Sequence, residues 1–160
     1  MTIRKATHSD IPRMMEIFAI ARRFMAETGN PNQWAETYPS VEQLTDDISR
    51  GDSFVCMDEG RIVAAFVLRG GNDPTYDIIY DGAWKNDRPY ATIHRIASNG
   101  EVKGIFRLAM DYALQHYQTI RIDTHRDNRV MRNALEKFGF EYCGIIHCWN
   151  GAERLAYQFG

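Results

Sequence analysis

The chain has 160 residues, of which 44% are hydrophobic and 25% are charged, and its formal net charge is -2 at pH 7. These values are ordinary for one globular domain that is large enough to bury a core. A slightly negative chain without a long basic segment argues against a nucleic-acid partner. No apolar run approaches the ~20 residues of a membrane span, and the first residues lack a signal-peptide core. We therefore expect a single cytoplasmic domain over residues 1–160 that binds neither nucleic acid nor a membrane.

The residue types that bind metals do not form a convincing site. The three cysteines are an odd number at no metal-like spacing, which fits reduced thiols in the cytosol. The sequence Asp123-x-His125-x-Asp127 offers suitable ligands, but no second cluster completes it. We expect no bound metal.

The first part of the chain predicts one strand, two helices and then a hairpin. In chain order these elements are expected at 2–6, 9–27, 40–50, 53–58 and 61–69. Ser40-Val-Glu-Gln43 matches a capping box, which marks the start of the second helix. Glu59-Gly60 is a two-residue hairpin signal between the two later strands.

The second part begins with the segment 70–89, which glycine and proline interrupt repeatedly. A short strand or helical turn is expected at 76–80. The later elements are a strand, a helix, a strand, a helix and two strands, expected at 90–98, 105–117, 119–124, 128–138, 140–148 and 154–159. Asn150-Gly151 is a strong signal for a turn between the last two strands.

This order of elements limits the fold. Hairpins lie on both sides of a crossover core, which excludes a purely parallel doubly wound sheet. We expect an α/β protein of the α+β type, with a mixed, largely antiparallel sheet of six or seven strands and helices on both faces. The closing strand, 154–159, is expected to offer an edge through which a homodimer could form.

The turn between strand 90–98 and helix 105–117 is the most informative feature of the chain. A helix N-terminus presents unpaired backbone N–H groups and the positive end of the helix dipole. Such a site can hold a phosphate group without a particular side chain. Gly104 would let the backbone approach that phosphate closely.

Two segments together resemble the GNAT N-acetyltransferase superfamily. The segment Asn128–Phe140, which ends in Glu-Lys-Phe-Gly-Phe, is similar to the late helix of that family. The turn Glu101-Val-Lys-Gly-Ile-Phe106 looks like the family's Gln/Arg-x-x-Gly-x-Gly/Ala pyrophosphate loop. The order of elements also matches, so the resemblance covers nearly the whole chain. It implies an acyl-CoA N-acyltransferase-like fold that uses acetyl-CoA (coenzyme A).

The resemblance also implies which residues contact the cofactor. Backbone groups of the strand before the turn would bind the pantetheine arm, namely Ile96, Ala97 and Ser98. Backbone amides of the turn would bind the pyrophosphate, namely Glu101, Val102, Lys103, Gly104, Ile105 and Phe106. Asn128 takes the place of an asparagine that contacts the cofactor arm, although it could simply cap its helix.

Three positions depart from the family pattern. Glu101 replaces Gln or Arg, so only its backbone can help to bind a diphosphate. Phe106 replaces Gly or Ala, so its side chain must point away from the phosphate. Leu135 replaces the tyrosine that is thought to protonate the departing thiolate. A positioned acid contributes ~10²–10⁴ in rate, yet a thiol of pKa ~8.5 can leave as thiolate. Tyr142, Cys143 or a water could substitute.

The implied reaction is direct attack of a substrate amine on the thioester. An alkyl amine has a pKa of ~10.4, so a base must accept its proton. The candidates are His94, Asp123 and His125, and the last two would form a relay if they share one strand face. Each has a structural alternative, since His94 could be a satisfied structural histidine and the other two could tie down a loop.

The acceptor pocket is expected between the early helices and the strands opposite the cofactor. Four aromatic residues are candidates to line it, namely Trp34, Tyr38, Tyr80 and Trp84. Aromatic faces would suit a cationic amine, whereas packing against nearby prolines is the alternative explanation. A small-molecule or peptide amine is the expected substrate. Two functions stay open, an N-acetyltransferase and a non-catalytic acyl-CoA binding or sensing module.

Overall fold

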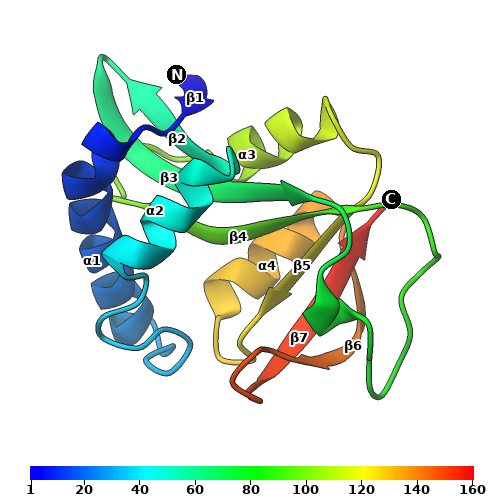
Figure 1. Ribbon diagram of the computed structural model, residues 1–160. Helices are drawn as coiled ribbons and strands as arrows, with labels where there is room; N and C mark the ends of the chain where they lie inside the picture. The colour runs from blue at the N-terminus through cyan, green and yellow to red at the C-terminus, as the bar shows by residue number, and fades with distance from the viewer.

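The computed structural model describes all 160 residues and contains seven strands and four α-helices (Figure 1). In chain order they are β1 (Thr2–Lys5), α1 (Ile11–Glu27), α2 (Val41–Ser49), β2 (Ser53–Asp58), β3 (Arg61–Gly70), β4 (Ala91–Ser98), α3 (Ile105–Leu114), β5 (Ile120–Thr124), α4 (Arg129–Phe138), β6 (Glu141–His147) and β7 (Glu153–Phe159). Two short 3-10 helices precede α1 and β4, at His8–Asp10 and Pro74–Tyr76. Every helix and strand predicted with defined bounds is present. The element expected at 76–80 is instead the second 3-10 helix followed by a single bridge between Tyr80 and Ile145.

The strands form one sheet in the order β1-β2-β3-β4-β5-β7-β6. All neighbours are antiparallel except β4 and β5, which are parallel. This confirms the mixed, largely antiparallel sheet and gives it seven strands. The expectation that the closing strand offers an edge is wrong, because β7 lies between β5 and β6 and both of its sides are paired. The edge strands are β1 and β6.

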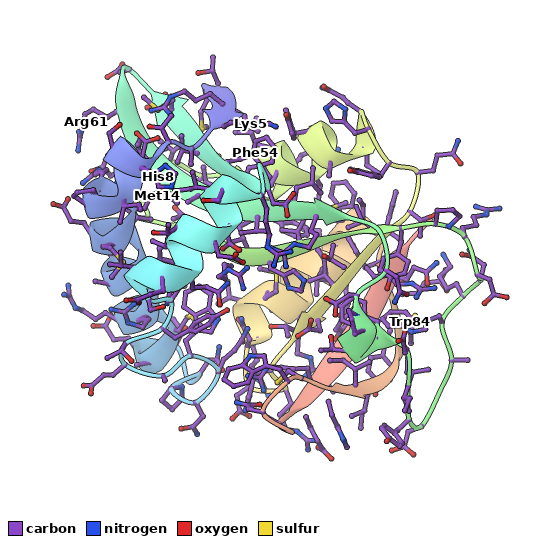
Figure 2. All side chains as sticks on the ribbon, in the orientation of Figure 1. Lys5, His8, Met14, Phe54, Arg61 and Trp84 are labelled. Carbon is purple, nitrogen blue, oxygen red and sulfur yellow. The ribbon has the colours of Figure 1, made fainter.

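Helices cover both faces of the sheet (Figure 1). Buried residues of α1, such as Met14 and Phe18, pack with Leu44 of α2 against one face (Figure 2). Buried residues of α3 and α4, such as Met110 and Leu135, pack in a larger core against the other. None of the helices combines the length and the apolar character that crossing a bilayer requires.

The segment between β3 and β4, which the sequence left least defined, is ordered by aromatic packing. Tyr76 is buried with Tyr90 in a third core cluster, and the ring of Trp84 lies 5.1 Å from that of Tyr76 (Figure 2). The Arg121 guanidinium lies 4.2 Å from the rings of both Trp84 and Tyr90. These contacts hold the segment against β5, β6 and β7.

The parallel strands β4 and β5 separate after a short contact. They pair only through Ala91 with Ile120 and Thr92 with Arg121. Beyond Thr92, β4 has no strand partner on this side. A cavity lies at the separation and is lined by residues 94–98 of β4 and by 123–124 of β5.

A β-bulge in β4 lies beside this cavity. Between the pairs Val67–His94 and Ala65–Ala97, β4 contains one residue more than β3. Arg95 in the bulge has φ 48°, a left-handed conformation that costs a non-glycine residue about 1–3 kcal/mol. Bulges of this kind change the direction in which side chains point. Here His94, Arg95 and the following residue all line the cavity.

Leu135 provides a test of the larger core. Its side chain is completely buried between α4 and the sheet. We expect Leu135→Ala to lower the free energy of unfolding by about 2–5 kcal/mol, because the truncation leaves a cavity. Val130→Ala, at an exposed position of the same helix, should change it by less than about 0.5 kcal/mol. Urea denaturation measures both, and equal effects would contradict the packing described.

Candidate functional site

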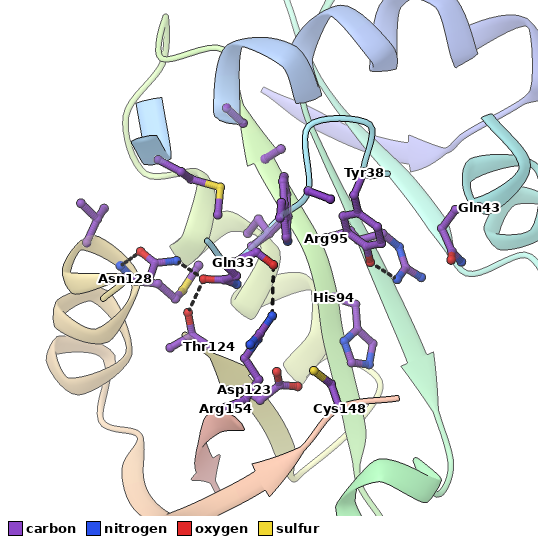
Figure 3. Close-up of a pocket in the computed structure, with 18 of the residues that line it drawn as sticks. Gln33, Tyr38, Gln43, His94, Arg95, Asp123, Thr124, Asn128, Cys148 and Arg154 are labelled. Carbon is purple, nitrogen blue, oxygen red and sulfur yellow. Dashed lines mark hydrogen bonds between the residues drawn. The ribbon is translucent and has the colours of Figure 1, made fainter. Parts of the chain in front are cut away.

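The cavity between β4 and β5 has a volume of about 890 Å³ (Figure 3). Its walls come from α1, the loop 28–40, α2, β3, the segment 73–75, β4, β5, the first turns of α3 and α4, the β6–β7 turn and β7. Ten of the residues singled out in the sequence line it, namely Trp34, Tyr38, His94, Ile96, Ala97, Ser98, Ile105, Phe106, Asp123 and Asn128. Tyr80, Trp84 and His125 do not. The loop residues Glu101, Val102, Lys103 and Gly104 lie directly before the wall that α3 provides.

The backbone amides at the start of α3 are free. The amides of Gly100 and Glu101 donate to the side chains of Ser98 and Asn99, both at 3.0 Å. From 102 to 107, no backbone N–H donates to a protein acceptor. Gly104 has φ 83°, and a Cβ there would meet no atom within 4 Å. The turn therefore has both the donors and the space that an anion requires.

Two side chains of this turn are held by contacts with other parts of the protein. The Glu101 carboxylate forms an exposed ion pair with Arg61 at 3.3 Å. The ring of Phe106 packs against those of Phe138 and Phe140, at 5.9 and 6.2 Å. The two departures from the family pattern in this turn therefore do not block the amides.

Gln33 in the loop 28–40 is a residue that the sequence did not identify. Its side-chain oxygen accepts hydrogen bonds from Asn30, Thr124, the His125 amide and Asn128, at 3.0–3.3 Å. It thereby joins the loop to the end of β5 and to the start of α4 (Figure 3). A single glutamine in a loop carries no sequence signal for such a role.

Asn128 caps its helix, which is the alternative to cofactor binding that the sequence suggests. Its Oδ1 accepts a hydrogen bond from the Met131 amide at 3.1 Å, which caps α4. Its Nδ2 donates to Gln33. Asn128 lines the cavity as well, so the cap also fixes a polar side chain in the wall.

His94 forms a pair with Asp73, which the sequence did not single out. His94 Nε2 lies 3.1 Å from Asp73 Oδ2, and Thr75 also donates to Asp73. Burial alone would raise the pKa of Asp73, but the hydrogen bonds from His94 and Thr75 outweigh it and lower the pKa to about 2. Asp73 is therefore ionised at neutral pH and orients the imidazole ring. The only sequence signal for it is Asp73-Pro74, which marks a turn.

Asp123 is held by a buried tyrosine. The Tyr76 hydroxyl donates to Asp123 Oδ2 at 2.6 Å. Burial, together with the negative charge of Asp123, raises the pKa of Tyr76. The tyrosine therefore keeps its proton and remains a donor to the carboxylate, which faces the cavity.

No direct hydrogen bond joins Asp123 and His125, so their expected relay through water stays a prediction. His125 Nδ1 accepts a hydrogen bond from the Asp127 amide at 3.0 Å, and burial, with the charge of Arg154, lowers the pKa of His125. The prediction placed both residues on one face of a strand. β5 ends at Thr124, so the alternation of side chains no longer applies at His125.

The aromatic candidates divide into two groups. Trp34 and Tyr38 line the cavity, and their rings contact each other at 5.7 Å. Tyr80 stacks on His147, and Trp84 donates its indole N–H to the backbone of the 3-10 helix. Tyr80 and Trp84 therefore make packing contacts with other parts of the fold and do not line the cavity. Trp149 in the β6–β7 turn also lines the cavity, and it is 82% exposed.

Leu135 and its suggested substitutes lie away from the cavity. Leu135 is fully buried in the core, Tyr142 is exposed on β6, and burial raises the pKa of the Cys143 thiol. None of the three lines the cavity, whereas the thiol of Cys148 does.

A buried ion-pair network supports the bulge. Arg95 donates to Asp47 of α2 at 2.7 and 2.8 Å and to the Tyr38 hydroxyl at 2.9 Å. Arg69 adds a bond to Asp47 at 3.2 Å. The Asp47 side chain is completely buried. The network thereby links α2 and the loop 28–40 to the strained residue in β4.

A split, mostly antiparallel sheet with free amides at a helix start defines the class of acyl-CoA N-acyltransferase-like proteins. No protein-family model and no curated protein matches the chain. A GNAT-family acetyltransferase from Streptococcus agalactiae shares 33% identity over 98% of this chain and 93% of that one, with a TM-score of 0.84. A GNAT-family acetyltransferase from Listeria monocytogenes shares 19% identity over 99% and 93%, with a TM-score of 0.71. A ribosomal-protein-alanine N-acetyltransferase from Brucella melitensis shares 18% over 99% of both chains, with a TM-score of 0.63. The chain belongs to the GNAT family of acetyltransferases.

Asp47 provides a test of the ion-pair network. We expect Asp47→Asn to lower the free energy of unfolding by about 3–5 kcal/mol, because it leaves Arg95 buried without a compensating charge. The matched control is Asp46→Asn, which removes an exposed pair with Arg50 and should cost less than about 1 kcal/mol. Thermal and urea unfolding measure both. Similar costs for the two variants would show that the network adds nothing to the fold.

Proposed function

We propose that this chain transfers an acetyl group from acetyl-CoA to a primary amine. Membership of the GNAT family supports acyl transfer in general, and the acetyl donor and the amine acceptor are our proposal. The observation that carries it is the set of free amides at 102–107, which lies directly beside the cavity between β4 and β5.

The residues present fit an acyl-CoA molecule. The free amides and the positive end of α3 would hold the diphosphate, with Gly104 leaving space in front of them. The unpaired side of β4, at residues 96–98, would offer backbone groups to the amides of the pantetheine arm. When bound, acetyl-CoA supplies an activated acyl group as a thioester.

We assign the role of general base to His94. Because Asp73 is ionised, its carboxylate only accepts hydrogen bonds, so His94 Nε2 carries the proton of their shared bond. The other ring nitrogen, Nδ1, is then free to accept a proton from the substrate amine. Asp123 faces the same cavity and would hold the amine while it is still charged. His125, the third candidate base, does not line the cavity, and its role as a base stays a prediction.

The position of Leu135 suggests how the leaving group departs. A leucine buried in the core donates no proton, so we propose that coenzyme A leaves as a thiolate. Its pKa of ~8.5 makes this acceptable at neutral pH. The competing function, an acyl-CoA sensor without catalysis, does not require a histidine–carboxylate pair in the cavity wall.

The acceptor class remains part of the proposal. The similar protein from Brucella melitensis is named as a ribosomal-protein-alanine N-acetyltransferase, and this supports including peptide amines among the proposed acceptors. A small-molecule amine is equally compatible with a cavity of this size. Action as one cytoplasmic domain and assembly as a homodimer stay predictions.

Acetyl-CoA binding tests the proposed diphosphate site. At 100 times its Kd, acetyl-CoA should stabilise the chain by about 2.7 kcal/mol. Gly104→Val should remove this stabilisation, because the new side chain fills the space in front of the amides. The matched control is Gly71→Val directly after β3, where φ is also positive and a Cβ would meet no atom within 4 Å. Thermal shift measures all three proteins, and an unchanged shift in Gly104→Val would refute the site.

Catalysis by His94 is tested separately. We expect His94→Gln to lower kcat by about 10²–10⁴ while acetyl-CoA binding stays unchanged. His116→Gln, at an exposed position near the end of α3, should keep the activity of the native chain. Thiol release over a panel of amines measures the rates. Binding of acetyl-CoA without turnover of any amine would favour the sensor.

A further inference from the structure

Arg154 is a buried cation without a carboxylate partner. It lies near the start of β7, lines the cavity and is only 9% exposed. Its Nη1 donates to the Glu153 carbonyl at 2.9 Å and its Nη2 to the Gln33 carbonyl at 3.0 Å (Figure 3). Backbone carbonyls do not neutralise its charge, and no ion pair of the structure includes Arg154. A guanidinium that is buried to this extent is normally paired.

The guanidinium has hydrogen-bonding capacity to spare. It uses two of its five N–H groups, so three are left without a protein acceptor. Its Nε is one of these donors, yet it is not among the side-chain atoms that are both unpaired and sealed from solvent. This N–H is therefore accessible to solvent, on a residue that lines the cavity. Parallel N–H groups of an arginine are the donors that bind a carboxylate most strongly.

The other arginines of the cavity wall are neutralised within the protein. Arg95 is paired with Asp47, and Arg69 with Asp47 and Asp52. Arg154 alone among the three arginines in the wall has no such partner. No carboxylate of the protein lies within ion-pair distance of Arg154, so a ligand would supply this charge at close range.

The groups suited to an amine lie on the same wall. In the register of β5 and β7, Asp123 is opposite Ala156, which is two residues from Arg154. Arg154 and Asp123 are thus diagonal neighbours on one face of the sheet, a relation in which residues lie roughly 7–8 Å apart. The His94–Asp73 pair also faces this cavity. A cationic and an anionic group of one ligand could be bound side by side here.

We infer that the acceptor is an amine that also carries a carboxylate, a free amino acid or a close chemical relative, and that Arg154 binds this carboxylate. The inference rests on the proposed acetyl transfer and adds the class of acceptor to it. Asp123 and His94 would then receive the amino group. Once the ammonium has lost one proton to solvent, attack of the amine would form the amide bond, break the thioester bond and release coenzyme A as a thiolate, with the second amine proton passing to His94.

Matched pairs of substrates test the inference on the native chain. L-phenylalanine with phenethylamine, L-lysine with cadaverine, and glycine with methylamine differ within each pair only by the carboxylate. We expect kcat/KM for thiol release to be about 10- to 100-fold higher for the carboxylate member of the preferred pair, as for a hydrogen bond to a charged group. Equal rates within every pair would overturn the inference.

Variants then assign the preference to Arg154. Arg154→Gln should remove it, mainly through a higher KM, while the rate with the decarboxylated amine and the Kd of acetyl-CoA stay unchanged. The matched control is Arg126→Gln, an exposed arginine that is paired with Glu153. A loss that is equal for both members of a pair, or weaker binding of acetyl-CoA, would overturn the assignment. The comparison on the native chain remains decisive if Arg154→Gln fails to fold.

Failure of the proposed function can be distinguished from failure of this inference. If the chain binds acetyl-CoA but turns over no amine, the acetyl-transfer proposal is wrong. The same pairs are then compared by calorimetry in the presence of coenzyme A. Tighter binding of the carboxylate members, lost in Arg154→Gln, would still support the carboxylate site. Equal binding, or no binding of either member, would overturn it.

Discussion

The separation of β4 from β5 is the constraint on which the site depends. A parallel pair normally continues as a ladder of backbone hydrogen bonds, but here it ends at Thr92. The polar backbone of β4 beyond this point faces a cavity instead of a neighbouring strand. Because buried backbone groups need partners, the inner side of the strand is suited to a ligand that carries amides of its own. The free backbone amides at the start of α3, which follows β4 in the chain, add further hydrogen-bond donors beside the cavity.

A second feature of β4 at this point is the bulge at Arg95. The extra residue adopts a left-handed conformation that is unfavourable for arginine. Asp47 offsets this cost, since it receives two hydrogen bonds from Arg95 in a fully buried position. Helix α2 therefore contributes to the site mainly from behind the cavity wall, to which it adds one residue, Gln43. Its role is to anchor the strained part of β4 through charge.

Local patterns explain what the sequence could predict. Hydrophobic periodicity and turn signals are short-range, so the sequence predicts the helices, the strands, the mixed sheet and the turn before α3. The order of strands depends on contacts between distant segments, and the prediction of β7 as an edge strand was therefore wrong. The pair of His94 with Asp73 and the bond of Tyr76 to Asp123 join segments that only tertiary packing brings together. The strand face predicted to be shared by Asp123 and His125 does not extend to His125, because β5 ends at Thr124.

The hydrogen bonds of Gln33 have a mechanical consequence for access to the cavity. One side-chain oxygen receives four donors, three of which come from the end of β5 and the start of α4. These bonds share a single acceptor, so a displacement of the Gln33 side chain would break all of them together. The loop that carries the cavity-lining residues Trp34 and Tyr38 is therefore coupled to the end of β5 and to Asn128, the residue that caps α4.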